Sequence, residues 1–66
     1  MHLHLREWRR QRFLTVRALA EKAGVAYTTV VRAETGRHQP TMKTIRRLAK
    51  ALDIKPEQLV EWEEGE

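Results

Sequence analysis

The sequence predicts an all-α fold of five short helices in one compact domain, and three observations support this prediction. Apolar residues recur at the three- and four-residue spacings of helices. Glycine, aspartate and proline stand between these segments, where helices end or begin. The chain has 66 residues and no linker rich in proline or glycine, so it has room for one core. We therefore expect one domain over residues 1–62, followed by an acidic tail over residues 63–66.

The first expected helix lies within residues 1–13, where Leu5, Trp8 and Arg12 share one face. The opening His-Leu-His-Leu alternates as a strand does. A strand needs a partner, and none is evident, so we expect these residues to fray or to join the helix. The hydroxyl group of Thr15 can then accept a hydrogen bond from the first turn of the second helix.

Two helical patterns meet at Gly24 with almost no loop between them. Gly24 can adopt the left-handed conformation that ends a helix. The apolar side of the helix before it consists of Val16, Leu19, Ala20 and Ala23. The next helix covers residues 27–35, and its inward residues are Val30 and Ala33. Two helices joined by so short a turn form a helix-turn-helix, which we place at residues 16–35.

Two further helices complete the domain. Gly36 ends the third helix, a polar loop covers residues 37–40, and Thr41 caps the fourth helix. The apolar positions of the fourth helix are Met42, Ile45, Leu48, Ala49 and Leu52. Asp53 tolerates the left-handed conformation needed after that helix, and Pro56 suits the first position of a fifth. The apolar residues of this short fifth helix are Leu59, Val60 and Trp62.

The charges of the chain are distributed unevenly. Residues 1–50 contain twelve Lys or Arg and three Glu, whereas residues 51–66 contain one Lys, one Asp and five Glu. A basic body with an acidic end favours a polyanionic partner over one face, although a solvated, charge-rich surface would look the same. The chain has no Cys, no apolar run of about 18 residues and no signal peptide, so we expect a cytoplasmic protein without disulfides or a membrane span.

With these elements placed, residues 3–62 resemble the helix-turn-helix family of phage lambda repressor and Cro, also called the xenobiotic-response-element (XRE) family. The matching residues are Arg9, Leu19 to Val25, Thr29, Val30, Glu34, Gly36, Pro40, Leu48, Ala49 and Leu52. Val16 and Ala26 depart from the family pattern, because they stand where the family usually has Gln and Ser. The resemblance implies a lambda-repressor-like domain whose third helix enters the major groove of DNA.

The outward side of the third helix agrees with this implication. The side chains able to contact bases are Tyr27, Thr28, Val31 and Arg32. Phosphate contacts are expected from the flanking residues Arg17, Thr29, Arg37, His38 and Lys43. Any of these side chains could instead be ordinary surface. In this family Arg9 and Glu34 also resemble a partly buried ion pair, the alternative being two exposed charges.

We therefore expect a sequence-specific regulator of transcription, with repression as its expected effect, that binds double-stranded DNA as a homodimer through Val60 and Trp62. Such a protein would be bacterial or phage-derived and associated with the nucleoid when bound. The alternative is an antitoxin-like or other protein-interaction module, whose fifth helix and acidic tail hold a protein partner. We expect neither catalysis nor a cofactor, because the chain lacks Ser and Cys and has one Asp. A metal site at His2, His4 and His38 would lack a carboxylate or thiolate in the same segment.

Overall fold

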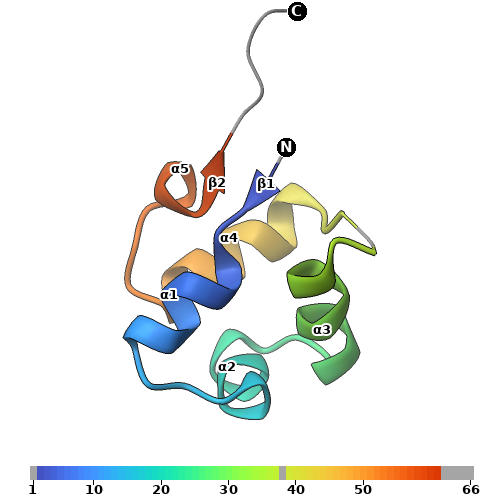
Figure 1. Ribbon diagram of the computed structural model, residues 1–66, viewed down its shortest axis with the longest axis vertical. Helices are drawn as coiled ribbons and strands as arrows, with labels where there is room; N and C mark the ends of the chain where they lie inside the picture. Colours follow the sequence, from blue (N-terminus) through green and yellow to red (C-terminus); the bar gives the residue numbers. More distant parts are fainter. Residues whose placement is uncertain (1, 38, 62–66) are drawn as a thin grey trace, which may run out of the picture.

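The computed structural model describes residues 2–37 and 39–61, and in this part of the chain five helices pack around one core (Figure 1). The helices are α1 (Leu5–Gln11), α2 (Val16–Ala23), α3 (Tyr27–Thr35), α4 (Met42–Ala51) and α5 (Pro56–Leu59). Two short strands, β1 (His2–Leu3) and β2 (Val60–Glu61), lie at the two ends of the described chain. The predicted all-α domain with five helices is confirmed, with α2 and α3 at the expected positions.

Every helix contributes at least one fully buried side chain to the core. The largest of these buried side chains are Leu5, Leu19, Val30, Ile45, Leu48, Leu52 and Leu59. Burial of one such side chain stabilises a fold by roughly 1.5–3 kcal/mol. Short helices are not stable alone, so each depends on burying its apolar side against the others. The position of α3 therefore depends on the helices packed behind it.

Two threonine hydroxyl groups cap helices as the sequence predicts. Thr15 Oγ1 accepts a hydrogen bond from the Ala18 amide at 3.0 Å, and Thr41 Oγ1 accepts one from the Thr44 amide at 3.2 Å. These bonds satisfy amides that have no partner within their own helix. The starts of α2 and α4 are thus fixed by local chemistry.

The expectation that the first residues form no strand is wrong. β1 pairs with β2 in antiparallel register, with His2 opposite Glu61 and Leu3 opposite Val60. The amide of His4 extends the connection by donating to the Leu59 carbonyl at 2.9 Å. The partner strand comes from the other end of the chain. The sequence near residues 2–3 therefore gives no sign of it.

Val60 is a core residue, and this corrects its expected place at a dimer interface. The fifth helix ends at Leu59, and Val60 takes an extended conformation with φ −107° and ψ 130°. Its residue surface is only 5% exposed. Exposure of both Val60 and Trp62 would favour the alternative, a protein-interaction module, and Val60 does not meet this condition. Trp62 and the acidic tail at residues 63–66 lie outside the described residues.

α1 is shorter than expected, and the side chains of Trp8 in α1 and of Arg12 just after it bond to distant backbone carbonyls. Trp8 Nε1 donates to the Gln58 carbonyl at 3.1 Å, and Arg12 Nε donates to the Leu52 carbonyl at 2.9 Å. The Arg12 guanidinium also lies 5.5 Å from the centre of the Trp8 ring. These contacts attach α1 to the end of α4 and to α5.

Candidate nucleic-acid interface

The turn between α2 and α3 has the geometry that a helix-turn-helix requires. Gly24 ends α2 with φ 72°, in the left-handed region that favours glycine. The chain then turns back, and the Val25 amide donates to the Ala20 carbonyl at 3.0 Å. Ala20 itself is buried, and its small side chain lets the two helices approach closely. The turn therefore sets the direction in which α3 leaves α2.

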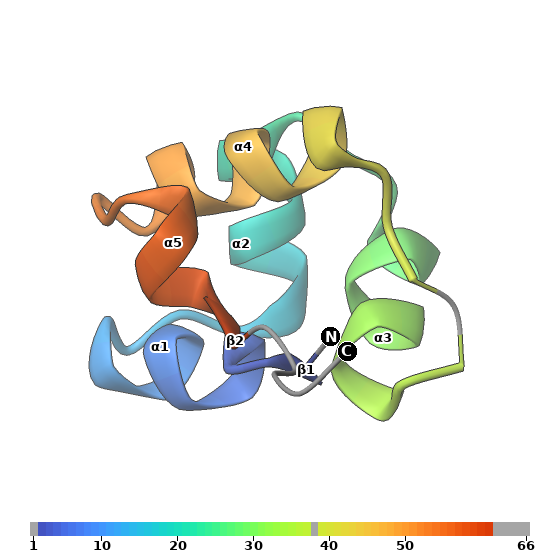
Figure 2. The same ribbon diagram turned by 90° about the horizontal axis from the view of Figure 1, so that it is seen from above.

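α3 presents one side to the core and the other to solvent, and it lies at one edge of the molecule (Figure 2). Val30 and Ala33 are buried, as predicted from their spacing. Tyr27 is 51% exposed, and Thr28 and Arg32 are also exposed, whereas Val31 is half-buried. The four predicted base-contacting residues are thus accessible to different degrees, and Val31 is the least accessible of them. Their contacts with bases stay predictions.

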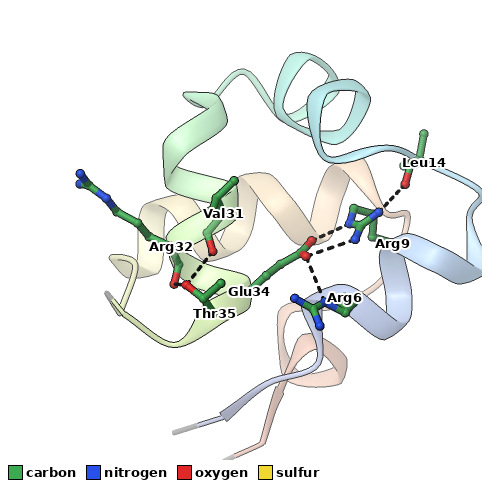
Figure 3. A network of polar contacts seen from close by, with 7 residues as sticks. All are labelled: Arg6, Arg9, Leu14, Val31, Arg32, Glu34 and Thr35. Carbon is green, nitrogen blue, oxygen red and sulfur yellow. Dashed lines mark hydrogen bonds and ion pairs between the residues drawn. The ribbon is translucent and has the colours of Figure 1, made fainter.

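Arg32 extends from α3 into solvent, away from the polar network on the inner side of the helix (Figure 3). At the end of the helix, Thr35 Oγ1 donates to the carbonyls of Val31 and Arg32 at 3.0 and 3.3 Å. The Arg32 carbonyl also accepts from the amides of Gly36 and Arg37, so several donors close the last turn of α3. A guanidinium group placed in this way has five donors available to a ligand.

A contact between Arg17 and Tyr27 joins the starts of α2 and α3. The Arg17 guanidinium lies 5.7 Å from the centre of the Tyr27 ring. Such a contact is worth about 0.5–1 kcal/mol at an exposed site. Residue spacing alone did not predict this pair, although both residues were expected at the interface. The contact places a predicted phosphate-contacting residue beside a predicted base-contacting one.

The predicted phosphate-contacting residues lie around α3 at different levels of exposure. Arg17 and Lys43 are exposed in the first turns of α2 and α4, and Arg37 is exposed just after Gly36. Thr29 is half-buried in α3. His38 lies outside the described residues. The three exposed cations can therefore reach a polyanion, and their roles stay predictions.

The predicted ion pair between Arg9 and Glu34 is present and joins α1 to α3 (Figure 3). Arg9 Nε donates to Glu34 Oε2 at 2.6 Å, and Arg9 Nη2 donates to Glu34 Oε1 at 3.2 Å. The side chains are only 14% and 4% exposed, respectively. This is a bidentate, charge-assisted contact, which fixes orientation as well as distance.

Two further residues complete this network, and the sequence did not indicate either of them. Arg9 Nη1 donates to the Leu14 carbonyl at 2.9 Å, and Arg6 Nε lies 3.5 Å from Glu34 Oε1. The Arg6 side chain is 52% exposed, so its contribution is that of a surface ion pair. Glu34 thus holds α3 against α1 from the inner side, opposite the solvent side that carries Arg32.

Among residues 2–37 and 39–61, no three His, Asp or Glu side chains come close enough to hold a metal ion. No helix in these ranges is both long and apolar enough to cross a membrane.

The tight turn, the supported α3 and its exposed outward side define a helix-turn-helix protein. A family model described as "Helix-turn-helix" matches residues 5–65. The chain therefore belongs to the helix-turn-helix family of Cro/C1 type, the XRE family, which consists of DNA-binding proteins and not of enzymes.

A curated relative supports the same assignment. An "Uncharacterized HTH-type transcriptional regulator" of Methanothermobacter thermautotrophicus is 38% identical over 52 residues, which are 79% of this chain and 75% of the relative. This organism is an archaeon, so the comparison gives no support to the expected bacterial or phage origin. No solved structure matches the chain significantly.

Proposed function

We propose that the protein is a transcriptional regulator that binds a specific sequence in double-stranded DNA and represses the adjoining promoter in the cytoplasm. One observation carries this proposal: α3 is fixed on its inner side by the core and by Glu34, while Tyr27, Thr28 and Arg32 are exposed on the other side. A rigid helix with exposed donors can place them against base edges in the major groove. The relative that is named a transcriptional regulator supports the regulatory role.

Arg32 and Arg37 should differ in what they contribute to binding. Arg32 can reach guanine O6 and N7 from α3, so Arg32→Ala should cost about 1–3 kcal/mol on the preferred site and relax preference at one base pair. Arg37 follows the left-handed Gly36, beyond the end of α3, and we expect it to contact the DNA backbone. Arg37→Ala should weaken binding to all sequences alike and make the salt dependence shallower by about one unit of slope per subunit.

The comparison needs a preferred site, which selection from random duplex DNA supplies. Each variant is then titrated against a panel of single-base variants of that site, by fluorescence anisotropy at fixed salt. Both substitutions remove one positive charge, so each is the control for the other. A uniform loss from Arg32→Ala together with a changed base preference from Arg37→Ala would show that the base-contacting surface lies elsewhere.

We also propose that the protein binds DNA as a homodimer. Two copies would place two α3 helices about 34 Å apart, one turn of the duplex, and so double the sequence that is read. Because Val60 belongs to the core, Trp62 is the remaining candidate among the two residues predicted for the interface. Sedimentation velocity should show a dimer on a palindromic site and a weaker association or none without DNA. Monomers in both conditions would refute the proposal.

A further inference from the structure

α4 carries four cations on one side and no acidic residue. Lys43, Arg46, Arg47 and Lys50 are three or four residues apart, so they form a single stripe along the helix, and all four are exposed. Like charges at these spacings destabilise a helix. Within residues 2–37 and 39–61, none of the four forms an ion pair. This repulsion is small for each pair, and an anion bound along the stripe would reduce it.

Neighbouring elements widen the stripe at its C-terminal end. One surface hollow is lined by Lys22 of α2 together with Arg47 and Lys50. A second hollow is lined by Arg46 and Lys50 together with Lys55, which precedes α5. We call the five cations around these hollows the α4 patch: Lys22, Arg46, Arg47, Lys50 and Lys55. Lys50 lines both hollows, and Asp53 is the acidic residue among their lining.

The α4 patch lies away from the proposed DNA-contacting surface. Arg17 and Lys43, which belong to that surface, are in the first turns of α2 and α4. The patch residues lie in the last turn of α2, in the middle and last turn of α4, and just before α5, and Arg47 Nη1 lies 3.4 Å from the Gly24 carbonyl. Figure 2 shows α3 on one side of the molecule, and the end of α4 with α5 on the other. One duplex held by α3 therefore leaves the patch open.

We propose that the α4 patch binds the phosphate backbone of a second DNA duplex, so that one protein bridges two DNA segments. On α4 the patch runs from Arg46 to Lys50, about 6 Å along the helix, over which a duplex carries about three to four phosphate charges. Flexible lysines and exposed arginines suit contacts to phosphates and do not by themselves read sequence. This inference rests on the proposed function, since α3 must hold the first duplex.

A capture experiment tests the bridge. The first duplex contains the selected site and is immobilised, whereas the second has a random sequence, carries a fluorophore and is added in solution. Wild-type protein should retain the second duplex on the first. Lys50→Glu should lower this retention by about fivefold or more, because it removes one attraction and adds one repulsion at the centre of the patch. Binding to the immobilised duplex should change by less than about twofold.

Arg10→Glu is the matched control, because Arg10 is exposed on α1 and lines neither hollow. It makes the same change of charge and should leave retention within about twofold of the wild type. Lys50→Gln, a milder change at the same position, should give an intermediate loss. Thermal melts of all variants establish that each is folded.

Several outcomes would overturn the bridge. Equal losses from Lys50→Glu and Arg10→Glu would show that overall charge is responsible. Retention that survives Lys50→Glu would show that the α4 patch does not hold the second duplex. A wild-type protein that binds the first duplex and captures no second one refutes the bridge alone. Failure to bind the first duplex refutes the proposed function as well.

Discussion

Glu34→Gln is expected to destabilise the protein by about 3–5 kcal/mol, because it leaves a largely buried guanidinium without its counter-charge. Arg9 is 14% exposed and donates two hydrogen bonds to the Glu34 carboxylate, at 2.6 and 3.2 Å. Glutamine has the same shape, so lost packing contributes little. A domain of this size has a stability of only a few kcal/mol, so most of the variant should be unfolded at 25 °C. Urea melts measure the loss in free energy of unfolding, and trimethylamine N-oxide is added to refold weak variants.

Two control substitutions separate burial from charge. Arg6→Gln removes the outer, half-exposed partner of Glu34 and should cost about 1 kcal/mol or less. Glu21→Gln changes an exposed carboxylate on α2 and should alter the free energy of unfolding by less than about 0.5 kcal/mol. A loss below about 1 kcal/mol for Glu34→Gln would mean that the pair is effectively solvated, in conflict with its burial.

Affinity for duplex DNA is expected to fall about a thousandfold between 50 and 200 mM salt. About six phosphates contacted by a dimer give a slope of about −5 for log affinity against log salt concentration. The physical cause is the release of counterions from DNA, which is less favourable when bulk salt is high. Fluorescence anisotropy titrations of the selected site at four or five salt concentrations give the slope.

A matched pair of substitutions assigns part of that slope to named residues. Lys43→Gln removes an exposed cation from the first turn of α4 and should make the slope shallower by about one unit per subunit. Arg10→Gln removes an exposed cation from α1, on no proposed DNA surface, and should leave the slope unchanged. An affinity that does not depend on salt would contradict the proposed phosphate contacts.

Local signals in the sequence determined most of the helix boundaries. α2 and α3 begin and end where the sequence predicts, because Thr15 caps one start and left-handed glycines end both helices. Asp53 takes the predicted left-handed conformation after α4, with φ 60°. Phe13 also has a positive φ, 57°, which a bulky residue adopts at a cost and which its type does not predict. That turn ends α1 early.

Contacts between distant elements could not be predicted from such local signals. Trp8 and Arg12 both donate to carbonyls of residues at least 40 positions away, and backbone acceptors leave no mark in the sequence. The strand pair was not predicted, because its two strands are also far apart in the sequence. At the interface, the Arg17–Tyr27 contact could have been predicted, because both residues were expected near the starts of consecutive helices. The Arg9–Glu34 pair was predicted from the family resemblance and not from spacing.

The pairing of β1 with β2 has a consequence for the order of folding. Closing a loop between residues 2 and 61 costs roughly 3–4 kcal/mol in chain entropy, far more than joining consecutive helices. The pair consists of two residues on each side, too few to offset that cost before the core exists. The ends of the chain should therefore join late in folding, and this corner should open first as the domain unfolds.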